Sequence, residues 1–296
     1  MFFQNLRYLY LVSIVLLAFL SIFLIYLATQ YNASFNNESE TIIVGFSIYP
    51  LYSLGKEIIG DKLKTILLVP PGYEPHNYEL SIQDISNIQK AKIIFYSGTA
   101  IDHWIENIKK IPSNNSVNFI PLNTQLTFVI KDDPHYWLSL TNAEAILKNI
   151  YINVVNIDKN NQDYYTANLN KALQKIAEIK KIADDKLKNI KQRKIITEHQ
   201  SFRYFAKDLN LEIVATFQEE NKESTLANIQ NLINAIHKFK IKVIFKDYGS
   251  INNDILSFAN NFNLKVYELD PLEGFRQVDY FDAYLYNINI LKQALE

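Results

Sequence analysis

Four residues of this sequence combine metal-binding chemistry with wide spacing along the chain. They follow or close apolar stretches that predict β-strands, and 59, 64 and 71 residues separate one from the next. Separations of this size exceed the span of one helix or turn, so only a tertiary fold could gather the four side chains. The set consists of three histidines and one aspartate: His76, His135, His199 and Asp270.

Three imidazoles and one carboxylate form a four-coordinate nitrogen and oxygen set. Such a set suits Zn²⁺ and is compatible with Mn²⁺. The chain has no cysteine, so a transition-metal site must use histidine together with aspartate or glutamate. Each residue alone has an ordinary alternative, since a lone histidine after a strand is commonly a surface or cap residue. Asp270 with Pro271 is also a turn signal, and a water molecule is an alternative fourth ligand.

The two other histidines serve as a comparison for this set. His103 in "IDHWIENI" and His237 in "NAIHKFK" lie inside helical patterns, away from predicted strand ends. We therefore expect both to be structural or surface residues.

A proline-rich turn surrounds His76 in the stretch "VPPGYEPHNYELS". Proline fixes the φ angle of its own residue, so Pro70, Pro71 and Pro75 restrict the backbone that carries the imidazole. A metal ligand needs such a restricted backbone, because its donor atom must be held within a fraction of an ångström. Glu79 and Glu198 could fix imidazole tautomers, with a solvated surface role as an equal alternative for each.

Short apolar strands alternate with helices along most of the chain. Continuous apolar strands separated by helices predict parallel sheets covered on both faces. Ligands bind beyond the carboxyl ends of such strands, so each half of the chain should contribute two of the four site residues. The predicted strands span residues 41–46, 64–69, 92–98, 117–122, 194–199, 212–217, 243–248 and 265–271.

A long helical pattern separates the two groups of strands. Residues 158–191 contain no proline or glycine, and their apolar positions recur at helical spacing. A helix of this length would span roughly 45–50 Å at ~1.5 Å per residue. A coiled-coil dimerisation arm is the competing interpretation, but the apolar repeat is short and lies between two α/β segments.

The predicted fold class is therefore α/β, with two parallel-sheet α/β lobes joined by one long backbone helix and the metal site in the interlobe cleft. We expect an N-terminal signal or anchor helix with its spacer at 1–40. The N-terminal lobe should span 41–157, the linking helix 158–192 and the C-terminal lobe 193–296.

The N-terminus contains an apolar segment, residues 8–28, that runs 21 positions without a charge. This is long enough to cross a bilayer as a helix. Arg7 precedes it and Glu38 is the first charge after it, so the N-terminus is expected in the cytoplasm and the remainder outside. The segment predicts a periplasmic protein, tethered to the inner membrane through residues 8–28 unless the helix is cleaved.

Composition and motifs exclude several function classes. The net charge of −1 means that the chain lacks the excess of basic residues that is typical of nucleic-acid-binding proteins. Catalytic zinc normally has three protein ligands and an open water position, whereas four protein ligands close the site. The stretch "TEHQSF" also lacks the second histidine of a His-Glu-x-x-His motif, and no phosphate-binding loop occurs in the chain. The sequence therefore predicts neither a zinc hydrolase nor any other enzyme.

Four stretches resemble one family of transport proteins: "GYEPHNYELSIQDISNIQKAKIIFYSG", "DPHYWLSLTNAEAILKNI", "TEHQSFRYFAKDLNL" and "ELDPL". Together they are similar to the zinc/manganese solute-binding proteins of ABC transporters (cluster A-I, zinc-uptake type), in the order and spacing of that family. The resemblance covers residues 41–295. It implies two lobes on one long helix, with metal held between them by His76, His135, His199 and Asp270.

The resemblance also implies partners and a cargo. The loaded protein is expected to be a monomer that docks on an ABC permease with its ATPase. Manganese-preferring relatives typically carry glutamate where this chain has His199, so an imidazole there favours Zn²⁺ over Mn²⁺. The sequence departs from the family pattern in two places. The loop at residues 124–133 is short and contains no histidine, and the stretch "FKDYG" near Lys246 differs from the residues usual in the family. A manganese importer component and a metal-binding, adhesin-like surface protein remain the alternatives.

Overall fold

The computed structural model describes residues 17–27, 41–73, 75, 78–111, 116–217, 226–276 and 278–296. The chain divides into two compact units, Met1–Ile42 and Ile43–Glu296. Residues 17–27 of the first unit form an exposed helix. The predicted membrane span at 8–28 thus lies partly outside the described residues. Among those that are described, none of the helices has both the length and the apolarity that crossing a bilayer requires.

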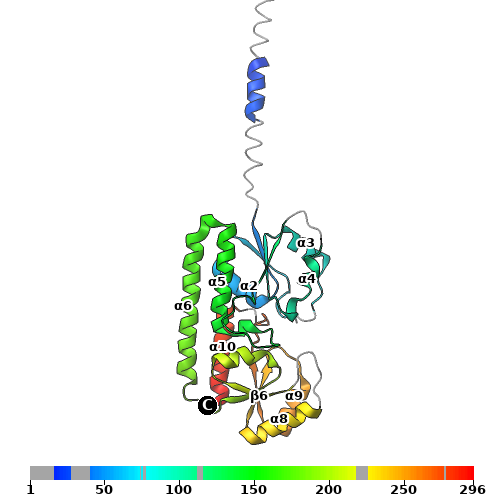
Figure 1. Ribbon diagram of the computed structural model, residues 1–296, viewed down its shortest axis with the longest axis vertical. Helices are drawn as coiled ribbons and strands as arrows, with labels where there is room; N and C mark the ends of the chain where they lie inside the picture. The colour runs from blue at the N-terminus through cyan, green and yellow to red at the C-terminus, as the bar shows by residue number, and fades with distance from the viewer. Residues whose placement is uncertain are drawn as a thin grey trace, which may run out of the picture. The chain divides into compact units, whose positions relative to one another are not determined.

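Two parallel four-stranded sheets form the centres of two lobes in the second unit (Figure 1). The strand orders are β2-β1-β3-β4 in lobe 1 and β6-β5-β7-β8 in lobe 2, so the chain follows the same path twice. Each of the eight strands falls within a range that the sequence predicted, which confirms the α/β class. The strands are β1 (Ile43–Phe46), β2 (Lys64–Leu67), β3 (Ile93–Tyr96), β4 (Asn118–Pro121), β5 (Lys194–Thr197), β6 (Glu212–Thr216), β7 (Val243–Asp247) and β8 (Lys265–Leu269).

The long predicted helix is present and runs beside both lobes (Figure 1). At 26 residues, α6 spans roughly 39 Å at ~1.5 Å per residue. It packs against α2 and α5 and, near the other end of its course, against the C-terminal helix α10. The helices are α2 (Tyr49–Ile59), α3 (Ile82–Lys90), α4 (Ile105–Ile108), α5 (Leu140–Ile157), α6 (Gln162–Leu187), α7 (Arg203–Asp208), α8 (Leu226–Phe239), α9 (Asn253–Asn261) and α10 (Tyr280–Leu295).

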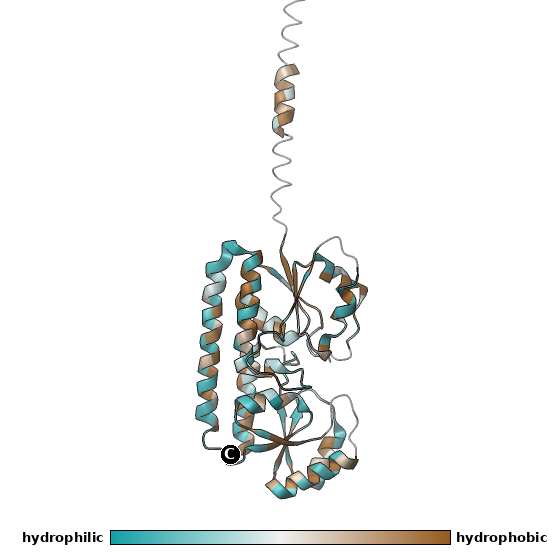
Figure 2. Ribbon diagram, in the orientation of Figure 1, coloured by the Kyte–Doolittle hydropathy of each residue, from teal (hydrophilic) through white to brown (hydrophobic). Residues whose placement is uncertain are grey.

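The observed long helix is shorter than its prediction at both ends. A 3₁₀ turn at Lys159–Asn161 precedes α6, and the helix ends at Leu187. The 18-residue helix α5 was not singled out from the sequence, and it lies alongside α6 in the structure (Figure 1). Figure 2 shows the strands of both lobes as apolar segments and the outward face of α6 as largely hydrophilic. The predicted arrangement of two lobes joined by one long helix is confirmed, and α5 packs beside that helix.

Local sequence signals explain where individual elements begin. Ser81 caps α3 by accepting a hydrogen bond from the backbone N–H of Asp84, whose carboxylate accepts one from Ser81 N in return. This capping box is the one that the sequence predicts after the proline-rich turn. It fixes the start of the helix that follows the segment carrying His76.

One close contact in lobe 1 supports a stability prediction. Gly55 of α2 lies against the ring of Phe46 in β1, and a Cβ atom at this glycine would be 2.1 Å from Phe46 Cζ. Alanine is favoured over glycine in a helix by about 1 kcal/mol, but overpacking of a core costs about 1–3 kcal/mol. We therefore expect Gly55→Ala to lower the free energy of unfolding, as measured by urea denaturation.

A double-mutant cycle with Phe46→Leu tests the physical reason. Removing the ring should relieve the clash, so the loss caused by Gly55→Ala should shrink in the Phe46→Leu background. Equal losses in both backgrounds would show that the ring contact is not responsible.

Candidate metal site

His135 is held in a fixed orientation by a neighbouring carboxylate in lobe 1. Oδ1 of Asp133 accepts hydrogen bonds from both the backbone N–H and the Nδ1 atom of His135, each at 3.0 Å. The Nε of Arg203, from α7 of lobe 2, lies 4.0 Å from the other oxygen of Asp133. His135 is buried, with its ring edge against Trp137 at 5.3 Å between centroids. A proton on Nδ1 leaves the lone pair of the neutral imidazole on Nε2, the nitrogen that a metal ion would bind.

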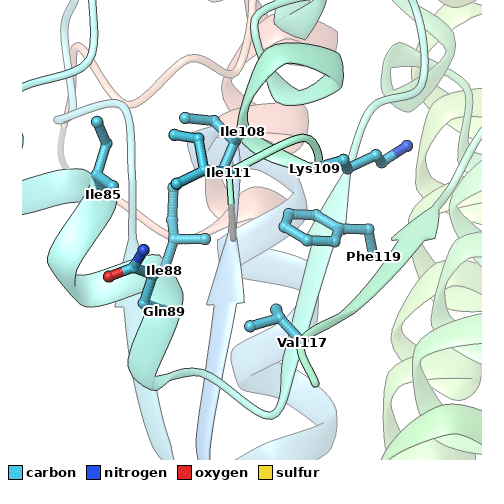
Figure 3. A pocket seen from close by; sticks show the side chains of 8 residues that line it. All are labelled: Ile85, Ile88, Gln89, Ile108, Lys109, Ile111, Val117 and Phe119. Atoms are coloured by element: carbon cyan, nitrogen blue, oxygen red, sulfur yellow. The ribbon is translucent and has the colours of Figure 1, made fainter. Parts of the chain in front are cut away.

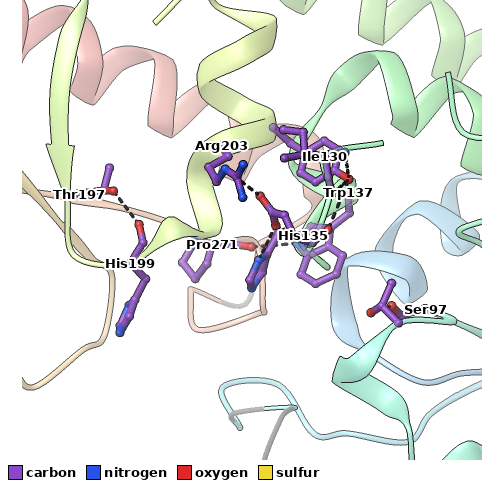
Figure 4. Close-up of polar contacts among 11 residues, drawn as sticks. Ser97, Ile130, His135, Trp137, Thr197, His199, Arg203 and Pro271 are labelled. Carbon is purple, nitrogen blue, oxygen red and sulfur yellow. Dashed lines mark hydrogen bonds and ion pairs between the residues drawn. The ribbon is translucent and has the colours of Figure 1, made fainter. Parts of the chain in front are cut away.

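His199 has an equivalent partner in lobe 2. Its Nδ1 lies 2.9 Å from Oδ2 of Asp247, which is the last residue of β7. The backbone carbonyl of His199 accepts a hydrogen bond from the hydroxyl of Thr197 at 2.6 Å (Figure 4). Burial raises the pKa of the Asp247 carboxyl, whereas the hydrogen bond and charge of His199 lower it. The ring of His199 is thus oriented from both its backbone and its Nδ1 atom.

Glu198 is a structural residue instead of a solvated one. It is fully buried, and its Oε2 accepts from the backbone N–H of Asp247 at 3.0 Å. Its Oε1 accepts from Ser250 Oγ at 2.7 Å and from Asn252 Nδ2 at 2.8 Å. With both oxygens engaged, Glu198 fixes the loop after β7 and is a poor choice as a metal ligand. Glu79 is exposed and takes no comparable position.

Asp270 follows β8 directly and is buried. Its Oδ1 accepts from the backbone N–H of Leu272 at 2.7 Å. Its own backbone is clamped by Asn287 of α10, through one hydrogen bond to N–H and one to the carbonyl, each at 2.7 Å. Burial raises the pKa of Asp270, and the Leu272 N–H and the charge of Arg276 oppose that rise. A bound cation would reverse the effect of burial and favour the ionised carboxylate.

Hydrogen bonds connect the loops that carry these residues. The indole Nε1 of Trp137 donates to the carbonyl of Pro271 at 3.1 Å, which ties the His135 loop to the Asp270 loop. The Asp247 and Asp270 loops leave adjacent paired strands, because Asp247 and Leu269 are register partners. Figure 4 shows the imidazoles of His135 and His199 extending in the same direction, with Pro271 between them in that view.

The predicted ligand set is not completely described. His76 lies outside the described residues. Within the ranges the structure describes, the one group of three imidazole or acidic side chains with ligand atoms inside 4.8 Å is Glu198, His199 and Asp247. His135, His199 and Asp270 are therefore not gathered to that spacing, and their joint ligation of one ion stays a prediction.

The comparison histidines lie where the sequence places them. His103 is exposed at the end of a 3₁₀ turn, with Nδ1 3.0 Å from the carbonyl of Ala100. His237 is exposed on α8. Both are surface residues, as predicted.

A pocket in lobe 1 is unrelated to this chemistry. It lies between α3, α4 and β4 (Figure 3), and its lining lacks imidazoles and carboxylates. Six of its eight lining residues are apolar, with Lys109 and Gln89 as the polar members. The lining residues are Ile85, Ile88, Gln89, Ile108, Lys109, Ile111, Val117 and Phe119.

Asp133 and Asp247 are partners of predicted ligand histidines that the sequence did not single out. Asp133 stands two residues before His135 and was available as a local signal. Asp247 lies in the stretch "FKDYG" that was noted as a departure from the family pattern, yet it supplies an acidic group beside His199.

Known proteins resemble this chain over most of its length. The high-affinity zinc uptake system protein ZnuA of Bacillus subtilis (strain 168) is 26% identical over 282 residues, covering 89% of this chain and 88% of that protein. The manganese ABC transporter substrate-binding lipoprotein PsaA of Streptococcus anginosus is 28% identical over 262 residues, covering 81% and 84%. The crystal structure of the metal-dependent lipoprotein YcdH from Bacillus subtilis superposes with a TM-score of 0.76 at 27% identity, covering 86% and 100%.

The family model described as zinc-uptake complex component A, periplasmic (ZnuA), matches residues 44–294. This range includes both lobes, the long helix and all four predicted ligands. The family consists of solute-binding proteins for transport, so the chain is not an enzyme. Its fold, its paired histidine and aspartate residues and this match agree, and the chain belongs to the family of zinc-uptake components that bind metal outside the cytoplasm for ABC importers.

Proposed function

We propose that this chain captures Zn²⁺ outside the cytoplasm with His76, His135, His199 and Asp270, and delivers the ion to an ABC permease driven by its ATPase. The observation that carries this proposal is the pair of histidines whose Nδ1 atoms each face an aspartate, at 3.0 Å in lobe 1 and 2.9 Å in lobe 2. Such carboxylate–histidine pairs orient the other ring nitrogen toward a metal ion.

The donor set supports Zn²⁺ as the preferred cargo. Imidazole nitrogen is a softer ligand than carboxylate oxygen, and three imidazoles suit zinc better than manganese. Mn²⁺ is the second candidate, because the manganese-binding relative from Streptococcus anginosus is as similar in sequence as the zinc-uptake protein from Bacillus subtilis. Asp270 supplies the one oxygen ligand that both ions accept.

Metal content and competitive titration of the purified full-length protein test the proposal. We expect one Zn²⁺ per chain that excess Mn²⁺ does not displace and that is lost in the His76→Ala variant. Displacement by Mn²⁺ would assign the protein to manganese uptake instead. The absence of stoichiometric metal would overturn the transport role and favour the surface-protein alternative.

Affinity for the cation should fall as the pH falls. Protons compete with a metal ion for the imidazole nitrogen. A histidine that is protonated at low pH must therefore lose that proton before it can bind the ion. We expect the apparent Kd for Zn²⁺ to rise steadily in titrations below about pH 6.5, the ordinary midpoint of imidazole. A Kd that is constant across this range would argue against a site built mainly from histidines.

For location, we propose that residues 8–28 direct the chain out of the cytoplasm and anchor it in the inner membrane. Several relatives are described as lipoproteins, but this chain has no cysteine to carry a lipid. Membrane fractionation of the full-length chain and of a variant starting at residue 34 provides the test. Membrane association of the longer form alone is expected, and equal partition of both forms would contradict the anchor.

A further inference from the structure

The carboxylate of Asp247 is built into the structure as a partner of His199. Asp247 is the last residue of β7, and His199 lies two residues after β5 ends at Thr197, which the register of the two strands pairs with Phe245. Continued by two residues beyond the end of β5, this register brings His199 level with Asp247, and Nδ1 and Oδ2 are 2.9 Å apart. The pairing of His199 with Asp247 is therefore positioned by the carboxyl ends of two paired strands.

A second hydrogen bond makes the arrangement reciprocal. The residue before His199 is Glu198, whose buried Oε2 accepts from the backbone N–H of Asp247 at 3.0 Å. The side chain of Glu198 thus fixes the backbone of Asp247. The side chain of Asp247 in turn fixes the imidazole ring of His199. Ser250 and Asn252 hold Glu198 from the other side. These hydrogen bonds together hold the carboxylate of Asp247 beside Nδ1 of His199.

The charge of Asp247 is compensated differently from that of Asp133. Arg203 lies 4.0 Å from Asp133, which offers that carboxylate a guanidinium countercharge. The electrostatic neighbours that act on Asp247 are His199, Glu198 and His135, with neither lysine nor arginine in this group. Its Oδ1 is buried and accepts no hydrogen bond from the residues described. Among the described residues, the imidazoles of His199 and His135 are the groups whose charge lowers the pKa of Asp247, and a cation bound by His199 would add positive charge beside the same carboxylate.

We propose that Asp247 is the positioning residue of the cation site in lobe 2, holding the proton of His199 on Nδ1 and adding a negative charge beside the ion. This inference rests on the proposed function for the identity of the ion. Asp247 faces the Nδ1 side of the ring, so it acts on the cation through His199 and is not itself a ligand of the ion that Nε2 binds.

Nitrogen-15 NMR of the metal-free protein tests the tautomer directly. The chain has five histidines, so the signals of His199 can be identified by their loss in the His199→Gln variant. At about pH 8, where ordinary imidazoles are neutral, we expect His199 to carry its proton on Nδ1 in the unsubstituted protein. In Asp247→Ala the proton should shift to Nε2, because the acceptor beside Nδ1 is gone. A proton on Nε2 in the unsubstituted protein would overturn the proposal.

Zn²⁺ titrations of three variants test the consequence for binding. Loss of a carboxylate partner of a metal-binding histidine typically costs 10- to 100-fold in affinity, so we expect a loss of about that size in Asp247→Ala. Asp247→Asn keeps an oxygen that accepts from Nδ1 but removes the charge, so its tautomer should be unchanged and its loss smaller. Asp208→Asn is the matched control, because Asp208 is a partly buried carboxylate bonded to Ser139 and Thr141.

The outcomes separate this inference from the proposed function. An unsubstituted protein that binds no Zn²⁺ would overturn the proposed function, while the tautomer of His199 would still decide the positioning role. Zn²⁺ affinity in Asp247→Ala equal to that of the unsubstituted protein would overturn the inference and leave the proposed function standing. A loss in Asp208→Asn as large as that in Asp247→Ala would overturn it too, since the effect would then come from any lost carboxylate.

Discussion

Replacing His199 with alanine is expected to lower the affinity for Zn²⁺ by roughly 100-fold or more. Structural zinc sites bind with about 10–16 kcal/mol, so one of four ligands accounts for about 3 kcal/mol, and every ~1.4 kcal/mol changes a Kd tenfold. The variant also leaves Asp247 as a mostly buried carboxylate without its imidazole partner. Competitive titration against a chelator of known zinc affinity measures the loss.

His103→Ala and His237→Ala are the controls for this prediction. Both side chains are exposed, one beside the carbonyl of Ala100 and the other on α8, so neither should change the Kd for Zn²⁺. His135→Ala should match His199→Ala, because its Nδ1 also faces an aspartate. Equal losses at all four positions, or none, would contradict the assignment of the ligands.

The fold was predictable because its signals are local. Each of the eight strands is a short apolar run bounded by turn residues, and the long helix has neither proline nor glycine. The alternation of these elements is enough to indicate parallel sheets. Helix α5, Leu140–Ile157, was not predicted. Its role is to pack beside α6, which only the tertiary structure reveals.

The candidate site was predictable only in part. Strand ends point to His199 and Asp270, because ligands gather at the carboxyl ends of parallel strands. The partner of His199 depends on strand register, which a single sequence does not define. Thr197 pairs with Phe245, and a shift of one residue would have replaced Asp247 with a neighbour. The contribution of Arg203 likewise crosses from one lobe to the other, where no local pattern applies.

Replacing Trp137 with alanine is expected to lower the free energy of unfolding by about 3–5 kcal/mol, the usual cost of removing a large aromatic side chain from a core. Trp137 is fully buried between the His135 and Asp270 loops. Its Nε1 donates to the carbonyl of Pro271 at 3.1 Å, and its own carbonyl accepts from the hydroxyl of Tyr280 at 2.6 Å. Urea unfolding of the metal-free protein, followed by circular dichroism, measures the loss.

Trp137→Phe separates the two contributions of this residue. Phenylalanine keeps most of the aromatic packing but removes the donor to Pro271, so we expect a smaller loss of about 1–3 kcal/mol for the buried carbonyl left without its partner. Because the indole also contacts the ring of His135, the alanine variant should bind Zn²⁺ more weakly than the phenylalanine variant. A loss below about 1 kcal/mol in Trp137→Ala would show that the two loops are held together without this bridge. The stability of the protein would then not depend on the hydrogen bond between Trp137 and Pro271, and the orientation of His135 would be set by its other contacts.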